Sequence, residues 1–151
     1  GCGSGRDALF FKRQGYSVTA FDASRELAAI ASKSLGESVR VMTFLDLSDN
    51  DEFDGVWACA SLLHVPSSEM PAVLHRLTGV LKTGAPMYAS FKLGSEEGLR
   101  CGRFFNDYDE SKFQIMLKNH PRLSAIKSWL TTDRRPGRQH EFWFNAIVCK
   151  V

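Results

Sequence analysis

The sequence has almost no net charge, no long hydrophobic run and no secretory signal. Its 151 residues carry nineteen basic and seventeen acidic side chains, a formal net charge of +2. Such a balance argues against a large basic surface for nucleic acid. No apolar run approaches the length needed to cross a bilayer. We therefore expect neither a nucleic-acid partner nor a membrane partner.

The cysteines also lack a pattern. Cys2, Cys59, Cys101 and Cys149 show neither metal-ligand nor disulfide spacing. Cys59 and Cys149 fall inside apolar segments and are expected to be small core residues. We therefore expect no metal site, and a reducing compartment such as the cytoplasm is the simplest setting.

What the chain does have is a glycine-rich turn at its start, Gly1-Cys2-Gly3-Ser4-Gly5. Alternate glycines let the backbone turn sharply and bring its N–H groups close to a ligand. The turn leads into a predicted helix, whose N-terminus favours negative charge. The spacing is G-x-G-x-G, and Arg6 stands where the dinucleotide fingerprint G-x-G-x-x-G has its last glycine. Asp22, at the end of a predicted strand, carries a carboxylate that can accept hydrogen bonds from a ribose diol.

Alternating strand and helix signals indicate an α/β domain with a closing hairpin. The spacing predicts helices over 7–14, 25–35, 67–80 and 109–118. Their predicted caps include Ser24 for the second, Ser67 or Ser68 for the third and Asp109 for the last. It predicts a loop over 49–51 and a mobile loop over 93–107. Strands are predicted over 17–21, 39–44, 55–60, 86–91, 123–132 and 141–151, the third of them buried on both faces.

These features resemble the class I S-adenosylmethionine-dependent methyltransferases. The turn 1–5 resembles the family's first motif, and Asp22 matches the acid that holds the ribose hydroxyls. Asp46 matches the acid near the adenine amino group. The segment 53–60 resembles the fourth strand, and 81–85 resembles the "L-K-P-G-G" turn with Thr and Ala replacing Pro and the second Gly.

The resemblance covers essentially the whole chain. Within the family, segments 61–66 and 105–108 are similar to bacterial small-molecule enzymes of the tellurite-resistance type. The resemblance implies a Rossmann-like sheet, mostly parallel with a C-terminal antiparallel β-hairpin and helices on both faces. It also implies methyl transfer from S-adenosylmethionine to a small-molecule acceptor, leaving S-adenosylhomocysteine.

The resemblance also implies a set of cofactor-binding residues. Asp49 or a backbone amide could serve in place of Asp46, and Ser24 could be a helix cap alone. Arg6 or Asp7 is expected near the amino-acid end of the cofactor. The full expected set is Gly1, Cys2, Gly3, Gly5, Arg6, Asp22, Ala23, Ser24, Asp46, Leu47, Ala60 and Ser61.

The catalytic residues are less well indicated. His64 follows the predicted fourth strand, at the edge where ligands bind in open α/β sheets. Its imidazole could accept a substrate proton, or it could be an ordinary loop histidine. Tyr108 is the second catalytic candidate, and with Asn106 it could border the acceptor pocket. The arginines of the last turn could contact an anionic substrate or form a solvated turn, namely Arg134, Arg135 and Arg138.

One expected element has no counterpart in the sequence, the strand that precedes the glycine turn in the family. That strand lies in the middle of the sheet, where its loss leaves buried backbone groups unpaired. We therefore expect residues 1–151 to be a single methyltransferase domain that is N-terminally incomplete. The alternative hypothesis is a truncated or degenerate cofactor-binding domain without activity. A nicotinamide dehydrogenase is disfavoured by Arg6 and by the closing hairpin.

Overall fold

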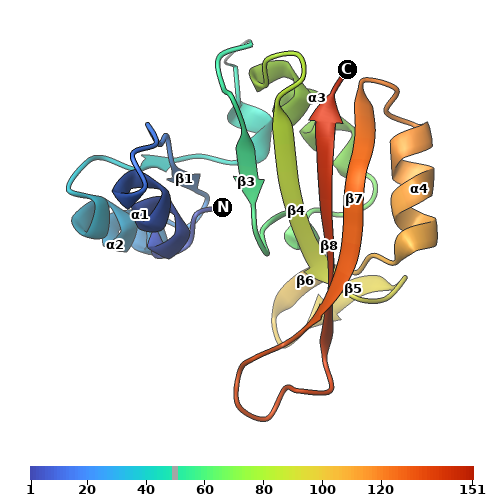
Figure 1. Cartoon of the computed structure of the whole chain (residues 1–151). Helices are drawn as coiled ribbons and strands as arrows, with labels where there is room; N and C mark the ends of the chain where they lie inside the picture. The colour runs from blue at the N-terminus through green and yellow to red at the C-terminus, as the bar shows by residue number, and fades with distance from the viewer. Residues whose placement is uncertain (49–50) are drawn as a thin grey trace. The chain divides into compact units, whose positions relative to one another are not determined.

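The computed structural model describes residues 1–48 and 51–151, which form two compact units. Unit 1 is Gly1–Asp46 and unit 2 is Leu47–Val151. Figure 1 draws both units. Of the predicted loop 49–51, only Asp51 belongs to the described residues, where it forms a bend.

Unit 1 is built on two helices and a pair of short parallel strands. The helices are α1 (Arg6–Arg13) and α2 (Arg25–Leu35), and a 3₁₀ turn, η1 (Phe44–Asp46), ends the unit. The strands β1 (Phe21–Asp22) and β2 (Arg40–Val41) pair with each other. The small core that joins these elements consists of Ala8, Ala28, Ala31, Leu35 and Val39.

Local sequence signals set both ends of α2. The Ser24 side chain accepts a hydrogen bond from the Leu27 N–H at 3.2 Å, as the capping prediction required. Gly36 ends the helix in a left-handed conformation, with φ of 70°. Glycine adopts this conformation without the steric cost that other residues have. The predicted bounds of this helix are therefore confirmed.

The strands of unit 1 are shorter than predicted. The predicted strand 17–21 is reduced to Phe21–Asp22, and 39–44 to Arg40–Val41. Phe44 was predicted to continue the strand, but it begins the turn η1. The physical reason is local, because the Asp46 carboxylate accepts hydrogen bonds from both the Thr43 N–H and the Thr43 hydroxyl, each at 2.8 Å. These bonds favour a turn over an extended chain.

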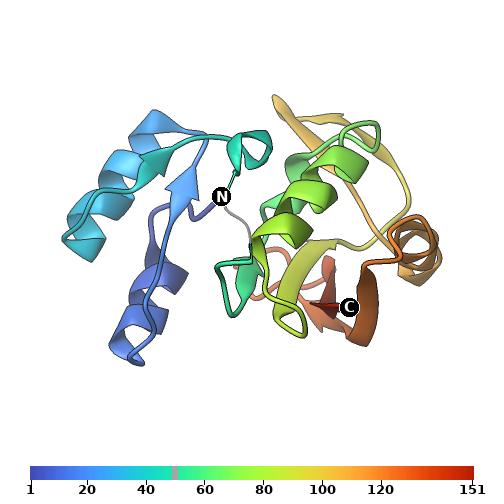
Figure 2. The same ribbon diagram turned by 90° about the horizontal axis from the view of Figure 1, so that it is seen from above.

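Unit 2 contains a mixed four-stranded sheet in the order β3-β4-β8-β7. β3 pairs with β4 in parallel, whereas β8 is antiparallel to both β4 and β7. Figures 1 and 2 show this sheet from two directions. The strands are β3 (Val56–Ala58), β4 (Pro86–Lys92), β7 (Leu123–Thr132) and β8 (Phe142–Lys150).

Two helices cover one face of this sheet. They are α3 (Met70–Val80) and α4 (Glu110–Lys118), and Asp109 caps α4 by accepting from the Lys112 N–H. Alternate residues of β4 and β8 face them, because successive side chains on a strand point to opposite faces. The shared core consists of Leu62, Leu74, Met87, Ala89, Phe91, Phe113, Met116, Ala146 and Val148.

The prediction that 55–60 is a strand buried on both faces is wrong. The strand β3 spans only three residues, and Trp57 is 49% exposed. β3 lies at the end of the strand order in unit 2, and α3 and α4 pack on the opposite face from Trp57. The Trp57 ring instead stacks on Tyr88, with 4.1 Å between centroids.

Two further predictions in unit 2 need correction. The predicted serine cap of α3 is wrong, because the N-cap position is Glu69 and the Ser67 N–H donates to Glu97 at 2.9 Å. The predicted mobile loop 93–107 contains a hairpin, β5 (Glu97–Arg100) and β6 (Arg103–Asn106). Its turn is Cys101-Gly102, with φ of 49° and 76°. Positive φ at both positions suits a two-residue hairpin turn, but Cys-Gly lacks the usual Asn-Gly signal.

One edge of the unit 2 sheet gathers the segments expected to carry chemistry. The parallel strands β3 and β4 end at this edge, β4 at Lys92. Lys92 is opposite Trp143 on β8, and Phe142 is opposite Thr132 on β7. The loop 133–141 and the β5–β6 hairpin therefore lie at this edge, the lower one in Figure 1. The strand β3 leads to His64, the last residue of the next turn, Leu62–His64. Ligands of open α/β sheets bind at this kind of edge.

Within the described residues, no helix has the length and apolar character needed to cross a membrane.

Candidate cofactor and acceptor site

Asp22 is the centre of the site in unit 1. One of its carboxylate oxygens accepts a hydrogen bond from the Gly3 N–H at 2.8 Å, and the other accepts from the Ser24 N–H at 2.9 Å. The Asp22 side chain, only 8% exposed, therefore fastens the glycine turn to the start of α2. An ionised carboxylate has about four lone-pair sites, so two bonds leave capacity for hydroxyl donors.

The backbone of the glycine turn is also held by β1. The nitrogens of Gly1 and Cys2 both donate to the Phe21 carbonyl, at 2.8 and 2.9 Å. The turn thus lies directly beside the strand that ends in Asp22. The predicted turn and the predicted acid, about twenty residues apart in sequence, are brought together within unit 1.

Glycine is needed at two positions of the turn for different physical reasons. A Cβ on Gly5, whose φ is 82°, would meet the Ala31 Cβ at 3.0 Å, so this glycine permits close packing of α1 on α2. A Cβ on Gly3, whose φ is 58°, would meet nothing within 4 Å. The space beside Gly3 is therefore open, as a ligand cradle requires.

The other predicted residues of unit 1 lie around this turn. Ala23 follows Asp22 and is exposed, and Ser24 forms the cap of α2 described above. Arg6 is highly exposed and forms an ion pair with Asp7 in the first turn of α1, with 2.8 Å between Nε and Oδ1. The Arg6 and Asp7 side chains therefore lie where α1 begins, beside the open turn.

Asp46 has a local structural task. Its carboxylate accepts from the Thr43 N–H and hydroxyl, and these bonds, the backbone one first, lower the pKa of Asp46 below its usual value. It is exposed at the end of unit 1. Its predicted contact with adenine stays a prediction, and the alternative ligand Asp49 lies outside the described residues.

Three predicted cofactor residues belong to unit 2. Leu47 is buried, with 4% exposure, and so is Ser61, with 8%. Ala60 has φ of 50°, a left-handed conformation that costs a non-glycine residue about 1–2 kcal/mol. Its N–H donates to the Ser90 hydroxyl at 2.8 Å, which holds this turn against β4. Such unusual backbone conformations cluster at functional sites.

His64 lies in a 3₁₀ turn, η2 (Leu62–His64), just beyond β3. Its side chain is exposed, and its Nδ1 atom lies 2.7 Å from the Phe104 carbonyl oxygen of β6. The Phe105 ring meets the imidazole at an edge, with 5.0 Å between centroids. The β5–β6 hairpin therefore positions the first catalytic candidate.

Tyr108, the second catalytic candidate, is 3% exposed. Burial, with a smaller contribution from Glu97, raises the pKa of Tyr108 to about 12. Its ring packs on Phe91, with 4.2 Å between centroids, and the Lys112 ammonium lies 4.9 Å from its ring centroid. At neutral pH this phenol is protonated, so it can act as a hydrogen-bond donor rather than as a base.

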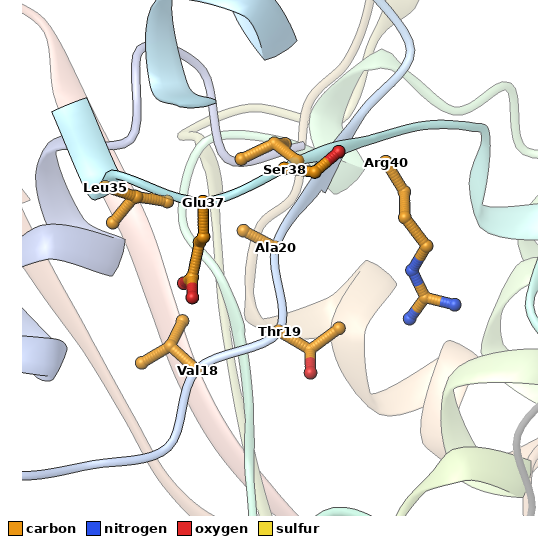
Figure 3. A pocket seen from close by; sticks show the side chains of 8 residues that line it. Val18, Thr19, Ala20, Leu35, Glu37, Ser38 and Arg40 are labelled. Carbon is orange, nitrogen blue, oxygen red and sulfur yellow. The ribbon is translucent and has the colours of Figure 1, made fainter. Parts of the chain in front are cut away.

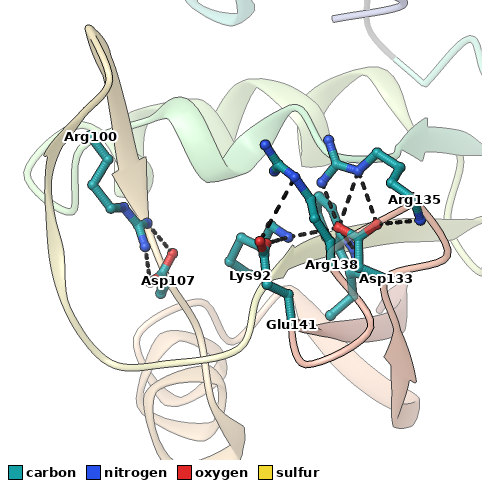
Figure 4. A network of polar contacts seen from close by, with 8 residues as sticks. Lys92, Arg100, Asp107, Asp133, Arg135, Arg138 and Glu141 are labelled. Atoms are coloured by element: carbon teal, nitrogen blue, oxygen red, sulfur yellow. Dashed lines mark hydrogen bonds and ion pairs between the residues drawn. The ribbon is translucent and has the colours of Figure 1, made fainter.

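An ion cluster at the same edge was not foreseen from the sequence. The Lys92 ammonium, at the end of β4, bonds to Asp133 at 2.9 Å and to Glu141. Asp133 opens the loop 133–141 and Glu141 closes it, so one cation ties both ends of the loop to β4 (Figure 4). Lys92 also lies 4.2 Å from the centroid of the Trp143 ring.

Asp133 is the most heavily bonded acid of this cluster. Its carboxylate, 3% exposed, accepts from the Arg135 and Trp143 side chains as well as from Lys92. The Arg135 guanidinium first, and then Lys92, hold the pKa of Asp133 far below its usual range. Arg135 is 55% exposed, as the solvated-turn interpretation expects, and it is also paired with Asp133. The sequence offered a weak signal, since Lys92 directly follows the apolar end of β4.

A hollow of about 210 Å³ in unit 1 lies away from the candidate site (Figure 3). Residues 18–20, which enter β1, and residues 37–40, which enter β2, line it with Leu35. Asp22 stands at the opposite, carboxyl end of β1. The hollow is also smaller than the roughly 300 Å³ at which ligand pockets usually begin.

Among residues 1–48 and 51–151, no group of three or more His, Cys, Asp or Glu side chains is arranged to hold a metal ion.

The first 84 residues match a family model. The model is described as "Methyltransferase domain", and its match to residues 1–84 covers more than half of the chain. A search of curated proteins found no match.

Solved structures share the fold. A SAM-dependent methyltransferase from Methanosarcina mazei is similar with a TM-score of 0.85 and 20% identity, over 100% of this chain and 90% of that one. The 1,6-didemethyltoxoflavin-N1-methyltransferase of Burkholderia thailandensis gives 0.83 and 22%, over 100% and 68%. TehB from Haemophilus influenzae gives 0.77 and 14%, over 100% and 56%. At these identities the likeness establishes the Rossmann-like α/β fold and no more.

Proposed function

The chain belongs to the methyltransferase-domain family and is an S-adenosylmethionine-dependent methyltransferase. We propose that it transfers the methyl group to a small-molecule acceptor. The observation that best supports the proposed cofactor-binding residues is the position of Asp22. Its carboxylate is fixed by two backbone N–H groups beside the open space at Gly3. A rigid acceptor of this kind suits a ribose diol.

When bound, the cofactor supplies a methyl group on a sulfonium, which an acceptor lone pair attacks in line with the departing sulfur. The chain's own residues then have three tasks. The Asp22 carboxylate accepts hydrogen bonds from the ribose hydroxyls, and the backbone of the glycine turn lies close to the cofactor. The remaining predicted residues of unit 1 line the cofactor site. Positioning of this kind is a large part of catalysis when the cofactor carries the reactive group.

A small acceptor is favoured by the edge of unit 2. There the β5–β6 hairpin contacts His64, and Lys92 fastens the loop 133–141 at the same edge. The net charge of +2 argues against a large basic surface for a polynucleotide. The Burkholderia thailandensis neighbour has a small molecule, 1,6-didemethyltoxoflavin, bound in its structure. That neighbour supports the acceptor class and says nothing of the acceptor's identity.

The proposal also includes the extent of the domain, the type of enzyme and the cellular compartment. The two units together form one methyltransferase domain over residues 1–151, of the bacterial small-molecule type. The four cysteines are free thiols, which favours the cytoplasm as the compartment.

Methyl transfer from labelled S-adenosylmethionine tests the proposal. The purified chain is incubated with a cell extract separated into small-molecule, protein and nucleic-acid fractions. We expect label in the small-molecule fraction, and loss of that label with Asp22→Ala. Label confined to protein or nucleic acid would overturn the acceptor class. Binding of S-adenosylhomocysteine without any transfer would favour the alternative, a degenerate cofactor-binding domain.

A further inference from the structure

The strand β6 holds the segment around His64 through two hydrogen bonds. The Phe104 carbonyl lies 2.7 Å from His64 Nδ1, and Asn106 Nδ2 donates to the Val65 carbonyl at 2.8 Å. One bond fixes the imidazole and the other fixes the backbone of the next residue. The two contacts come from alternate residues of one strand, so the side chain and its support are set by the same element.

The first of these bonds decides where the imidazole proton resides. A carbonyl oxygen only accepts hydrogen bonds, so Nδ1 must carry the hydrogen. In the neutral ring Nε2 then has the lone pair, and it is the nitrogen that can take up a proton. His64 is exposed and its Nδ1 is engaged by the Phe104 carbonyl, so Nε2 is the ring nitrogen left for a substrate.

Asn106 is built in as a rigid part of this arrangement. Its side chain is completely buried, and its Oδ1 atom accepts from the Lys112 ammonium at 2.6 Å and from the Ser67 hydroxyl at 3.4 Å. A buried amide is costly unless its donors and acceptors are satisfied. Asn106 therefore links β6 to α4 and to the segment that follows His64.

The charged groups around this arrangement are few. Glu97 on β5 accepts from the Ser67 N–H, and Lys112 on α4 bonds to Asn106. The Arg100 guanidinium lies 4.4 Å from the centroid of the Phe105 ring, and it is bound to Asp107. Each of these charges has a partner within the same cluster.

We propose that Asn106 is a positioning residue which, with the Phe104 carbonyl, keeps His64 protonated at Nδ1 so that Nε2 takes a proton from the methyl acceptor. The acceptor is then an O–H or N–H group that loses its proton on methylation. Its lone pair forms the new bond to the methyl carbon, the carbon–sulfur bonding pair stays on sulfur, and its proton passes to Nε2. The inference rests on the proposed function and adds the acceptor's chemical class.

The histidine tautomer is measured directly by long-range ¹H–¹⁵N correlation on the ¹⁵N-histidine-labelled chain at a pH where the ring is neutral. We expect His64 to show a protonated Nδ1 and an unprotonated Nε2. Exposed His140 in the loop 133–141 is the internal control, and we expect it to show a mixture of the two tautomers. The variant Asn106→Ala should convert His64 to a mixture of tautomers. Nε2 protonation of His64 in the unaltered chain, or a mixture like that of His140, overturns the inference without any need for a variant.

With an acceptor in hand, kinetics provide the second measurement. His64→Ala should lower kcat roughly a hundredfold, as loss of a general base does. Asn106→Ala should lower kcat by less, with KM and the affinity for S-adenosylhomocysteine unchanged. Normal cofactor affinity and methyl transfer that is indifferent to His64 would defeat this inference alone. Absent cofactor binding would defeat the proposed function instead.

Discussion

The two units hold their functional groups by different means. In unit 1 a single carboxylate, Asp22, bonds to backbone N–H groups of the glycine turn and of the start of α2. In unit 2 the loop 133–141 is held by the Lys92 ammonium, which comes from a strand about forty residues earlier. The first arrangement orients backbone for a ligand, and the second fastens distant segments of the chain to each other.

The buried charges explain why the second arrangement is the more sensitive to mutation. The Lys92 side chain is 12% exposed and the Asp133 side chain 3%. Removing Lys92 takes away the cation that Asp133 and Glu141 share, and leaves Asp133 with Arg135 and Trp143 as partners. In unit 1, a lost bond to a backbone N–H can be replaced by water, because the glycine turn lies at the surface.

The largest expected effect is therefore on Lys92. We expect Lys92→Met to lower the free energy of unfolding by about 3 kcal/mol, at the lower end of the range for breaking a buried ion pair, because Arg135 still pairs with Asp133. The control is Lys82→Met, since Lys82 is 49% exposed in a surface pair with Asp54 and should contribute under about 1 kcal/mol. Urea unfolding of the two variants makes the measurement. Equal losses of unfolding free energy in the two variants would show that the buried ion cluster stabilises the fold no more than a surface ion pair does.

The next effect is on Asp22, and it is an effect on binding. Asp22→Ala should weaken S-adenosylhomocysteine binding roughly tenfold or more, because a hydrogen bond to a charged group contributes about 1.5–3 kcal/mol. Isothermal titration calorimetry measures the affinity, with Asp54→Asn as an exposed-acid control. An unchanged affinity for the Asp22 variant would remove this residue from the site and, with it, the contrast between the units.

A smaller effect separates two glycines of unit 1. Gly5 and Gly15 both have positive φ, of 82° and 91°, but only at Gly5 would a Cβ meet another residue. Gly5→Ala should therefore destabilise the chain by about 1–2 kcal/mol more than Gly15→Ala, the added cost being overpacking against Ala31. Thermal unfolding of the pair tests this. Similar losses would mean that α2 shifts freely and that the turn is not held by packing.

The smallest effect is the dependence of stability on pH. Hydrogen bonds with Arg135 and Lys92 lower the pKa values of Asp133 and Glu141 in the folded state. Acids with lowered folded pKa values stabilise the fold above their ordinary pKa, near 4, and this contribution is lost as the pH falls through the folded values. We expect the unfolding midpoint to be level from pH 8 to about 5 and to fall below about pH 4. The fall should be shallower in Lys92→Met, and an equally steep fall would exclude Lys92 as its source.

Much of unit 1 was predictable because its signals are local. The cap at Ser24, the glycine that ends α2 and the acid at the end of β1 are each set by a few neighbouring residues. The lengths of β1 and β2 were not predictable, because a strand extends only as far as its hydrogen-bonded neighbour. The turn η1 depends on the Asp46 side chain, which competes locally with strand formation.

In unit 2 the predictions failed where partners are distant in sequence. The sequence predicts a mobile loop where the structure has the β5–β6 hairpin, because the Cys101-Gly102 turn lacks the usual Asn-Gly hairpin signal. The burial of Tyr108 was likewise invisible, because Phe91 and Lys112 reach it from other elements. The ion pair between Lys92 and Asp133 was invisible for the same reason.

The sequence by itself determined the α/β class, the glycine turn, its acid and the closing hairpin, because these depend on periodicity and on residues that act locally. Only the tertiary structure decided that Lys92 fastens the loop 133–141 and that β6 holds His64 through Phe104 and Asn106. Those contacts join residues about forty positions apart. A pattern along the chain records which residues are present, whereas strand pairing decides which of them meet.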